Sequence, residues 1–303
     1  MSTTSAPPST EPVPSSPAGA MQASCFADVL ALLTMDPQDG ALVEAAVAIA
    51  DGMPARAILP VGLPDRVRCP WGVSPQSALL ADHRARREDA SAHLAMLRRT
   101  ATRCGGIVDC LALEHANHGL IGSILSVART ARLLVLGVPA DIGRTLTPDR
   151  RFTDALVATG RPLLVLPRKA NLVTRPRRVL VAWRDGPASS RAVHEALPWL
   201  RSAHAVRVVT VLGPSLSQAE RESAAGEARL RGHLARHGVT ATVACVDAQN
   251  RPPEHALMDE AGAMGADLIV TGAYGHPRAL EFVFGGTTIN LLSRCRLPIL
   301  MAH

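Results

Sequence analysis

The stretch "GAYGHPRALEFVFGG", Gly272 to Gly286, follows the apolar run "DLIVT" and carries glycines at both of its ends. A short apolar run that stops at a glycine is typical of a buried strand. The sequence "TTINLLSR" that comes after the loop favours a helix. We therefore predict a strand, a glycine-rich loop and a helix in this order.

The same order of elements occurs twice in the chain. "DVLALLTMDPQDGALVEAAVAIAD" (28–51) parallels "RVLVAWRDGPASSRAVHEALPWLR" (178–201), and "RLLVLGVPA" (132–140) parallels "DLIVTGAYG" (267–275). The first glycine and the later proline are 162 − 137 = 25 residues apart in one copy and 298 − 272 = 26 in the other. This agreement predicts two copies of one structural plan.

Apolar runs alternate with helical patterns throughout the second copy. We predict strands near 178–183, 205–211, 239–246, 267–271 and 297–301, and helices near 188–202, 217–237, 253–264 and 287–294. This alternation predicts an α/β fold with two similar doubly wound, Rossmann-like domains, each a mostly parallel five-stranded sheet flanked by helices.

The predicted boundaries are a disordered tail at 1–24, a first domain at 25–170 and a second at 174–303. The early aspartate Asp36 lies 101 residues before Gly137, whereas its counterpart Asp185 lies 87 residues before Gly272. The first copy therefore holds 101 − 87 = 14 more residues in this interval. We expect the insertion at 65–77.

Composition excludes several classes of protein. The 303 residues contain no run of about 18 uncharged apolar residues, and the tail has no cationic start or apolar core. We expect a cytoplasmic protein without a membrane partner. The net charge of +6 comes with only 3% aromatic residues and no basic stripe, which argues against a nucleic-acid partner. Six scattered cysteines without CxxC spacing suggest neither zinc nor disulfides.

The glycine loop has two interpretations. Gly272 and Gly275 would let a ligand approach the backbone, and the helix start at Gly285 and Gly286 would offer free N–H groups to phosphates. Alternatively, these glycines only shape a turn and let the helix pack closely on the sheet. The chain has no P-loop motif and no G-x-G-x-x-G after a strand.

The segment "DLIVTGAYGHPRALEFVFGG" with the final strand "LPILMAH" resembles the end of a universal stress protein domain, whose nucleotide-binding members carry G-x2-G-x9-G-[ST]. Gly272, Gly275 and Gly285 match this motif, whereas Gly286 replaces its hydroxyl residue, a role that Thr287 could take. The resemblance covers 174–303 well and 25–168 more loosely.

The resemblance implies that ATP or another adenine nucleotide is bound in the second domain, with Mg²⁺ accompanying it and no other metal. Asp185 would help seat the adenosine and Val211 would contact the base. Without gaps, however, Arg184 occupies the acidic position, so that Asp185 is equally well explained as a turn residue. In the first domain Ala140 and Asp149 replace motif glycines. We expect that domain to bind no nucleotide and to pair with the second.

Three functions remain open. The resemblance favours a stress-response regulatory or binding module; the alternatives are a nucleotide-independent interaction protein, in which the two domains act as a built-in dimer, and a slow ATPase. We predict no catalytic residues, and we leave open both a homodimer and further protein partners. Glu114, His115 and His118 could contribute to a metal site or be ordinary loop residues.

Overall fold

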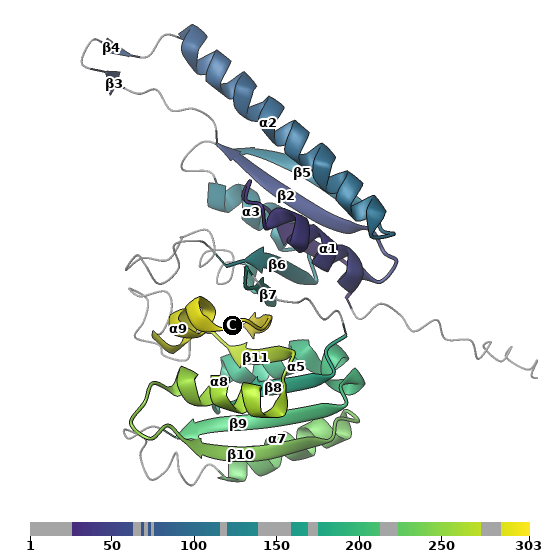
Figure 1. Cartoon of the computed structure of the whole chain (residues 1–303), viewed down its shortest axis with the longest axis vertical. Helices are drawn as coiled ribbons and strands as arrows, with labels where there is room; N and C mark the ends of the chain where they lie inside the picture. The colour runs from purple at the N-terminus through teal and green to yellow at the C-terminus, as the bar shows by residue number, and fades with distance from the viewer. Residues whose placement is uncertain are drawn as a thin grey trace, which may run out of the picture.

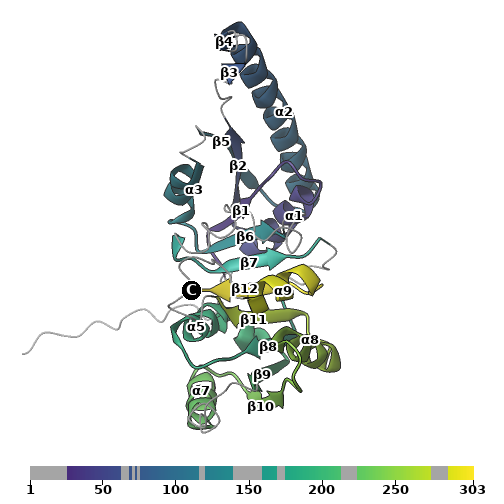
Figure 2. The same ribbon diagram turned by 90° about the vertical axis from the view of Figure 1, so that its left-hand side faces the viewer.

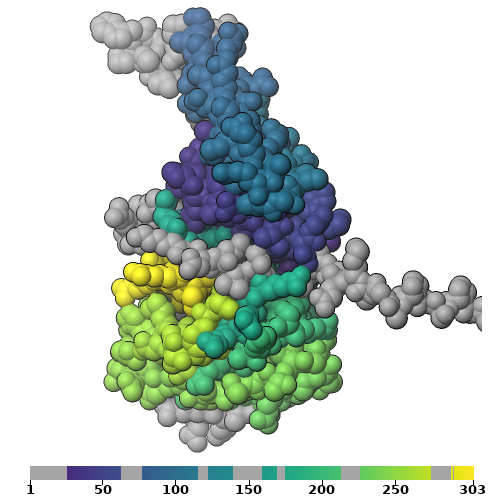
Figure 3. Space-filling view, turned by 45° about the vertical axis from the view of Figure 1, so that its right-hand side comes forward, coloured from purple at the N-terminus to yellow at the C-terminus, as the bar shows by residue number. Residues whose placement is uncertain are grey.

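The computed structural model describes residues 26–62, 68–69, 72–73, 76–115, 120–138, 159–168, 175–212, 224–273 and 286–303. We call the part up to 168 the N-terminal half and the part from 175 the C-terminal half. The two halves stack along the long axis of the molecule, and one long helix of the N-terminal half projects beyond its sheet (Figures 1 and 3). The predicted tail at 1–24 lies outside the described residues.

The N-terminal half contains β1 (Val29–Leu32), α1 (Asp39–Ala50), β2 (Ala55–Gly62), β3 (Arg68–Cys69), β4 (Gly72–Val73), α2 (Gln76–Arg103), β5 (Val108–His115), α3 (Leu120–Ala128), β6 (Leu133–Gly137) and β7 (Leu163–Leu166). The small antiparallel pair of β3 and β4 falls in the predicted insertion. The helix that follows it, α2, is the one that projects (Figure 1).

The C-terminal half contains β8 (Arg178–Ala182), α5 (Pro187–Ser202), β9 (Ala205–Leu212), α7 (Ala224–Arg236), β10 (Ala241–Asp247), α8 (Pro253–Met264), β11 (Leu268–Gly272), α9 (Gly286–Arg294) and β12 (Ile299–Ala302). These elements agree closely with the predicted strands and helices. The α/β class and the helix-flanked, mostly parallel sheet are therefore confirmed.

The two halves share one continuous sheet of ten strands, in the order β10-β9-β8-β11-β12-β7-β6-β1-β2-β5. In this sheet all neighbouring strands of the same half are parallel, and the halves meet where β12 pairs antiparallel with β7, with Leu300 opposite Leu164. Figure 2 shows these two strands in the middle of the molecule. The two predicted five-stranded sheets are thus joined edge to edge.

Strand register shows how closely the halves correspond. Leu32 pairs with the residue before Gly137, and Ala182 pairs with the residue before Gly272. Counted from these pairs, Pro37 corresponds to Pro187, and Asp36 corresponds to Gly186 rather than to Asp185. Asp36 and Asp185, which we matched in the sequence, are therefore offset by one residue in the structure.

Both faces of the sheet are buried, which explains why its strands are almost continuously apolar. In β1, Val29 and Ala31 belong to a core cluster shared with α1, α2, α5 and α7, whereas Leu30 and Leu32 belong to a second cluster shared with α3, α8 and α9. Each cluster extends across both halves. The halves therefore share their hydrophobic core as well as their sheet.

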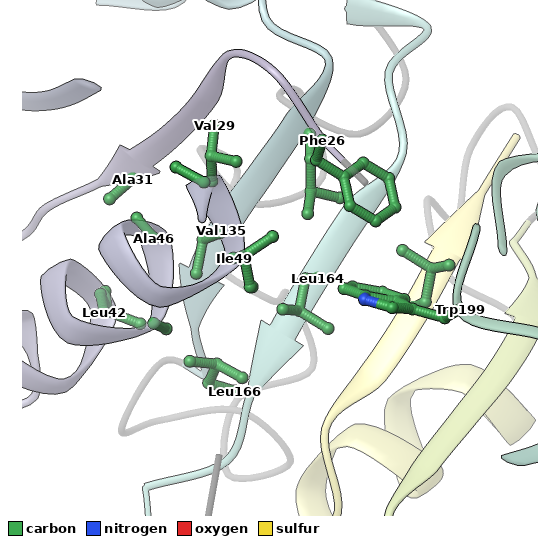
Figure 4. Packing of buried hydrophobic residues seen from close by; sticks show 14 of the residues in the cluster. Phe26, Val29, Ala31, Leu42, Ala46, Ile49, Val135, Leu164, Leu166 and Trp199 are labelled. Carbon is green, nitrogen blue, oxygen red and sulfur yellow. The ribbon is translucent and has the colours of Figure 1, made fainter. Parts of the chain in front are cut away.

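An aromatic contact reinforces this joint. Phe26, which precedes β1, is fully buried and lies 4.7 Å, ring centroid to ring centroid, from Trp199 on α5 (Figure 4). Arg132 lies over the Phe26 ring and forms an ion pair with Glu195 of α5. No helix in the described part of the chain is long and apolar enough to span a membrane.

Candidate functional site

The carboxyl edge of the C-terminal half brings three of the predicted residues together. Val211 lies near the end of β9, Asp185 lies in the turn after β8, and Gly272 ends β11. These three strands are parallel neighbours in the sheet. Asp185 is exposed, and none of the described residues pairs with its carboxylate, whereas Val211 is half-buried.

Gly272 lies directly against the first turn of α5. A Cβ atom at this position would be 2.6 Å from the backbone nitrogen of Ser189 and 2.8 Å from the carbonyl carbon of Ala188. Only a residue without a side chain therefore allows the helix to approach the strand so closely. The close contact with α5 supports the packing interpretation for this glycine.

The helix α9 begins at Gly286, as predicted, and Thr287 lies in its first turn. Contacts with α8 fix the position of α9, because the Asn290 side chain donates a hydrogen bond of 2.8 Å to the Glu254 carboxylate of α8, a residue only 2% exposed. Arg294 also contacts the His255 ring, with 2.8 Å between the nitrogens. Gly275 and Gly285 lie outside the described residues.

The equivalent edge of the N-terminal half is filled by its own side chains. The Gln38 amide donates a 2.8 Å hydrogen bond to the Leu166 carbonyl, and its Oε1 lies 2.7 Å from where a Cβ at Gly137 would be. Asp36 forms a 2.6 Å ion pair with Arg168 across the same edge. The backbone N–H of Gln38 and the Arg168 guanidinium hold the pKa of Asp36 below its ordinary value, although burial opposes them.

A buried carboxylate closes this edge further. Asp39, fully buried in the first turn of α1, accepts hydrogen bonds from the backbone N–H groups of Thr34 and Met35 and lies 2.9 Å from Nε2 of His93 on α2. Burial raises the pKa of Asp39, against the lowering effects of His93 and the backbone donors. Ala140 and Asp149, which replace motif glycines, lie outside the described residues.

The residues considered for a metal do not converge. Glu114 pairs with Arg87 of α2 at 2.9 Å, and His118 lies outside the described residues. His115 ends β5. Across the described ranges, no group of three or more histidine, cysteine or acidic side chains is arranged to hold a metal ion.

Two residue pairs, Asp39 with His93 and Glu254 with Asn290, were missed in the sequence. Both acids lie in the first turn of a helix, where acidic residues are common for reasons of capping and of the helix dipole. Their burial depends on which helix packs against them. A local sequence pattern does not reveal which helix will pack against these acids.

Taken together, the fold is that of a doubly wound α/β protein, a class that binds its ligands at the carboxyl edge of the strands. The family comparison agrees, because residues 176–303 match the sequence model of the Universal stress protein family. This C-terminal part of the chain is therefore similar to universal stress proteins.

Solved structures extend the likeness over both halves. A universal stress protein from Archaeoglobus fulgidus DSM 4304 is 13% identical with a TM-score of 0.66, and the match covers 89% of this chain and 94% of that one. A protein from Pseudomonas aeruginosa UCBPP-PA14 assigned to the same class is 15% identical with a TM-score of 0.55, covering 91% and 92%. At such identities the likeness shows the fold alone. None of the curated proteins compared with the sequence matches it.

Proposed function

We propose that this chain is a cytoplasmic regulatory or binding module of the universal stress type, which binds one adenine nucleotide, ATP or a shorter one, in its C-terminal half. The nucleotide would occupy the carboxyl edge of β9, β8 and β11, with Val211 beside the base, Asp185 beside the adenosine, and Gly275, Gly285, Gly286 and Thr287 around the phosphates. Mg²⁺ would accompany the phosphates. No dedicated reaction is part of this proposal.

The observation that carries the proposal is the difference between the two equivalent edges. In the N-terminal half, Gln38 and the Asp36–Arg168 ion pair occupy the edge. In the C-terminal half Asp185 is exposed and unpaired among the described residues. A nucleotide could enter the N-terminal edge only by displacing the Gln38 side chain and the Asp36–Arg168 ion pair, so that one nucleotide per chain is expected.

The test is to purify the chain without added nucleotide, denature it, and identify any released molecule by mass spectrometry, with a calorimetric ATP titration alongside. ATP or AMP at about one per chain supports the proposal. Gly275→Val should abolish binding, because a side chain would stand where phosphate must come, while circular dichroism stays unchanged. A stoichiometry of two would contradict the assignment of the N-terminal half.

One observation favours the second candidate, a nucleotide-independent interaction protein. Gly272 is already explained by its contact with the backbone of Ser189, without any ligand. In that case the denatured protein releases no nucleotide, ATP produces no heat, and the shared sheet serves as a built-in dimer.

A further inference from the structure

A cavity lies in the groove between α5 and α7 and reaches the carboxyl edge of the sheet at Asp185. These helices cover the same face of the sheet (Figure 2). The cavity measures about 680 Å³, within the range of small-molecule sites. It is lined from α5 by Ser190, Val193 and His194, from α7 by residues between Gly226 and Arg236, and by Trp183 and Asp185 before α5.

The space exists because α7 presents small residues to it. Gly226, Ala228 and Gly232 all line the cavity. A Cβ at Gly232 would meet only the tip of the Arg236 side chain, at 3.6 Å, so that the backbone leaves room there. Glycine inside a helix is unfavourable compared with alanine, and here it keeps the groove open.

One end of the groove collects imidazole and guanidinium groups. The His233 ring lies 5.4 Å from that of His194 and 4.6 Å from that of His237, centroid to centroid, and Arg201 contacts His237. Burial, and then His237, His194 and Arg236, lower the pKa of His233. Among the described lining residues the only carboxylate is Asp185, which lies at the start of α5, whereas Arg236 ends α7.

The wall also contains a buried hydrogen-bond donor without an acceptor. The Nε1 atom of Trp183 has no partner among the described residues, and the side chain is only 8% exposed. Buried donors are nearly always paired, and each exception calls for an explanation. A ligand that brings an acceptor and a planar or apolar part to Trp183, and a negative charge to His233 and Arg236, would satisfy both ends.

We propose that the groove between α5 and α7 is a binding site for a small organic anion, one that joins a phosphate or carboxylate group to a planar or apolar part. This site shares Asp185 with the proposed nucleotide site, but its other described lining residues are different, and it does not depend on nucleotide binding. The described residues offer no metal-binding arrangement here, although three histidines lie close together. An anion is the ligand that the Arg236 guanidinium and the imidazole N–H donors favour.

The test is a calorimetric titration of the full chain with phenyl phosphate, with phenol and inorganic phosphate as half-probes. Saturable binding at about one per chain, at least about tenfold tighter than either half-probe, is expected. Arg236→Gln should weaken it about tenfold, because a hydrogen bond to a charged group is lost. The matched control is Arg231→Gln, on the exposed side of the same helix, which should change nothing.

Filling the groove gives an independent test. Gly232→Leu should abolish phenyl phosphate binding and leave helicity intact, whereas Ala235→Leu at an exposed position of α7 should bind normally. Binding lost in Gly275→Val but kept in Gly232→Leu would place the ligand in the nucleotide crevice and overturn this proposal alone. The absence of heat at millimolar phenyl phosphate, or binding of Zn²⁺ alone, would also overturn it.

Discussion

Replacing Gly272 by alanine should destabilise the protein, because the new methyl group has no space. It would lie 2.6 Å from the Ser189 nitrogen and 2.8 Å from the Ala188 carbonyl carbon, and both are backbone atoms that cannot rotate away. The first turn of α5 would have to move off the strand. Overpacking of this kind costs about 1–3 kcal/mol.

The assay is urea unfolding followed by circular dichroism, with two other glycines as matched controls. At Gly137 the new methyl meets only the Gln38 side chain, which can move at the loss of its hydrogen bond to Leu166, about 1 kcal/mol. At Gly262 nothing lies within 4 Å, and alanine should stabilise α8 by up to about 1 kcal/mol. A Gly272→Ala protein as stable as Gly262→Ala would refute this reasoning.

Three further predictions concern other parts of the fold. Trp199→Ala should lower the free energy of unfolding by about 3–5 kcal/mol, since it empties a buried site against Phe26; an unchanged urea midpoint would contradict this. Asp39→Ala should cost about 2–4 kcal/mol in the same assay, because two backbone donors lose their acceptor, and Asp39→Asn should recover most of the loss. The folded state disfavours a proton on His233, whereas the unfolded state accepts one near the usual pKa of 6.5. Lowering the pH from 7.5 to 5 should therefore reduce the free energy of unfolding of the wild type more than that of His233→Gln. Parallel plots of this free energy against pH would argue against the prediction.

Most of the fold could be predicted because each strand is an apolar run with both faces buried. The glycines at 137 and 272 and the prolines at 162 and 298 mark equivalent strand ends in the two copies. The joint between the halves was not predictable in detail. The runs "LLVL" of β7 and "ILMA" of β12 are equally apolar, and nothing in such a run identifies its neighbour or its direction.

The candidate site was predictable only where chain order fixes it. Val211, Asp185 and Gly272 reach one edge because the ends of parallel strands must do so. The reason for Gly272 could not be predicted, since it depends on how closely α5 packs on β11. The burial of Glu254 and its bond to Asn290 likewise arise from the packing of α8 against α9.

Because β7 and β12 belong to one polypeptide, their pairing is a folding step and cannot be undone by dilution. At this joint each half meets the other half of the same chain, so that a substitution there needs a match on one side only. The core shows this freedom: counted from the equivalent prolines, Ile49 of α1 corresponds to Trp199 of α5, which packs against the Phe26 ring (Figure 4). A covalent pair can thus specialise each of its members independently.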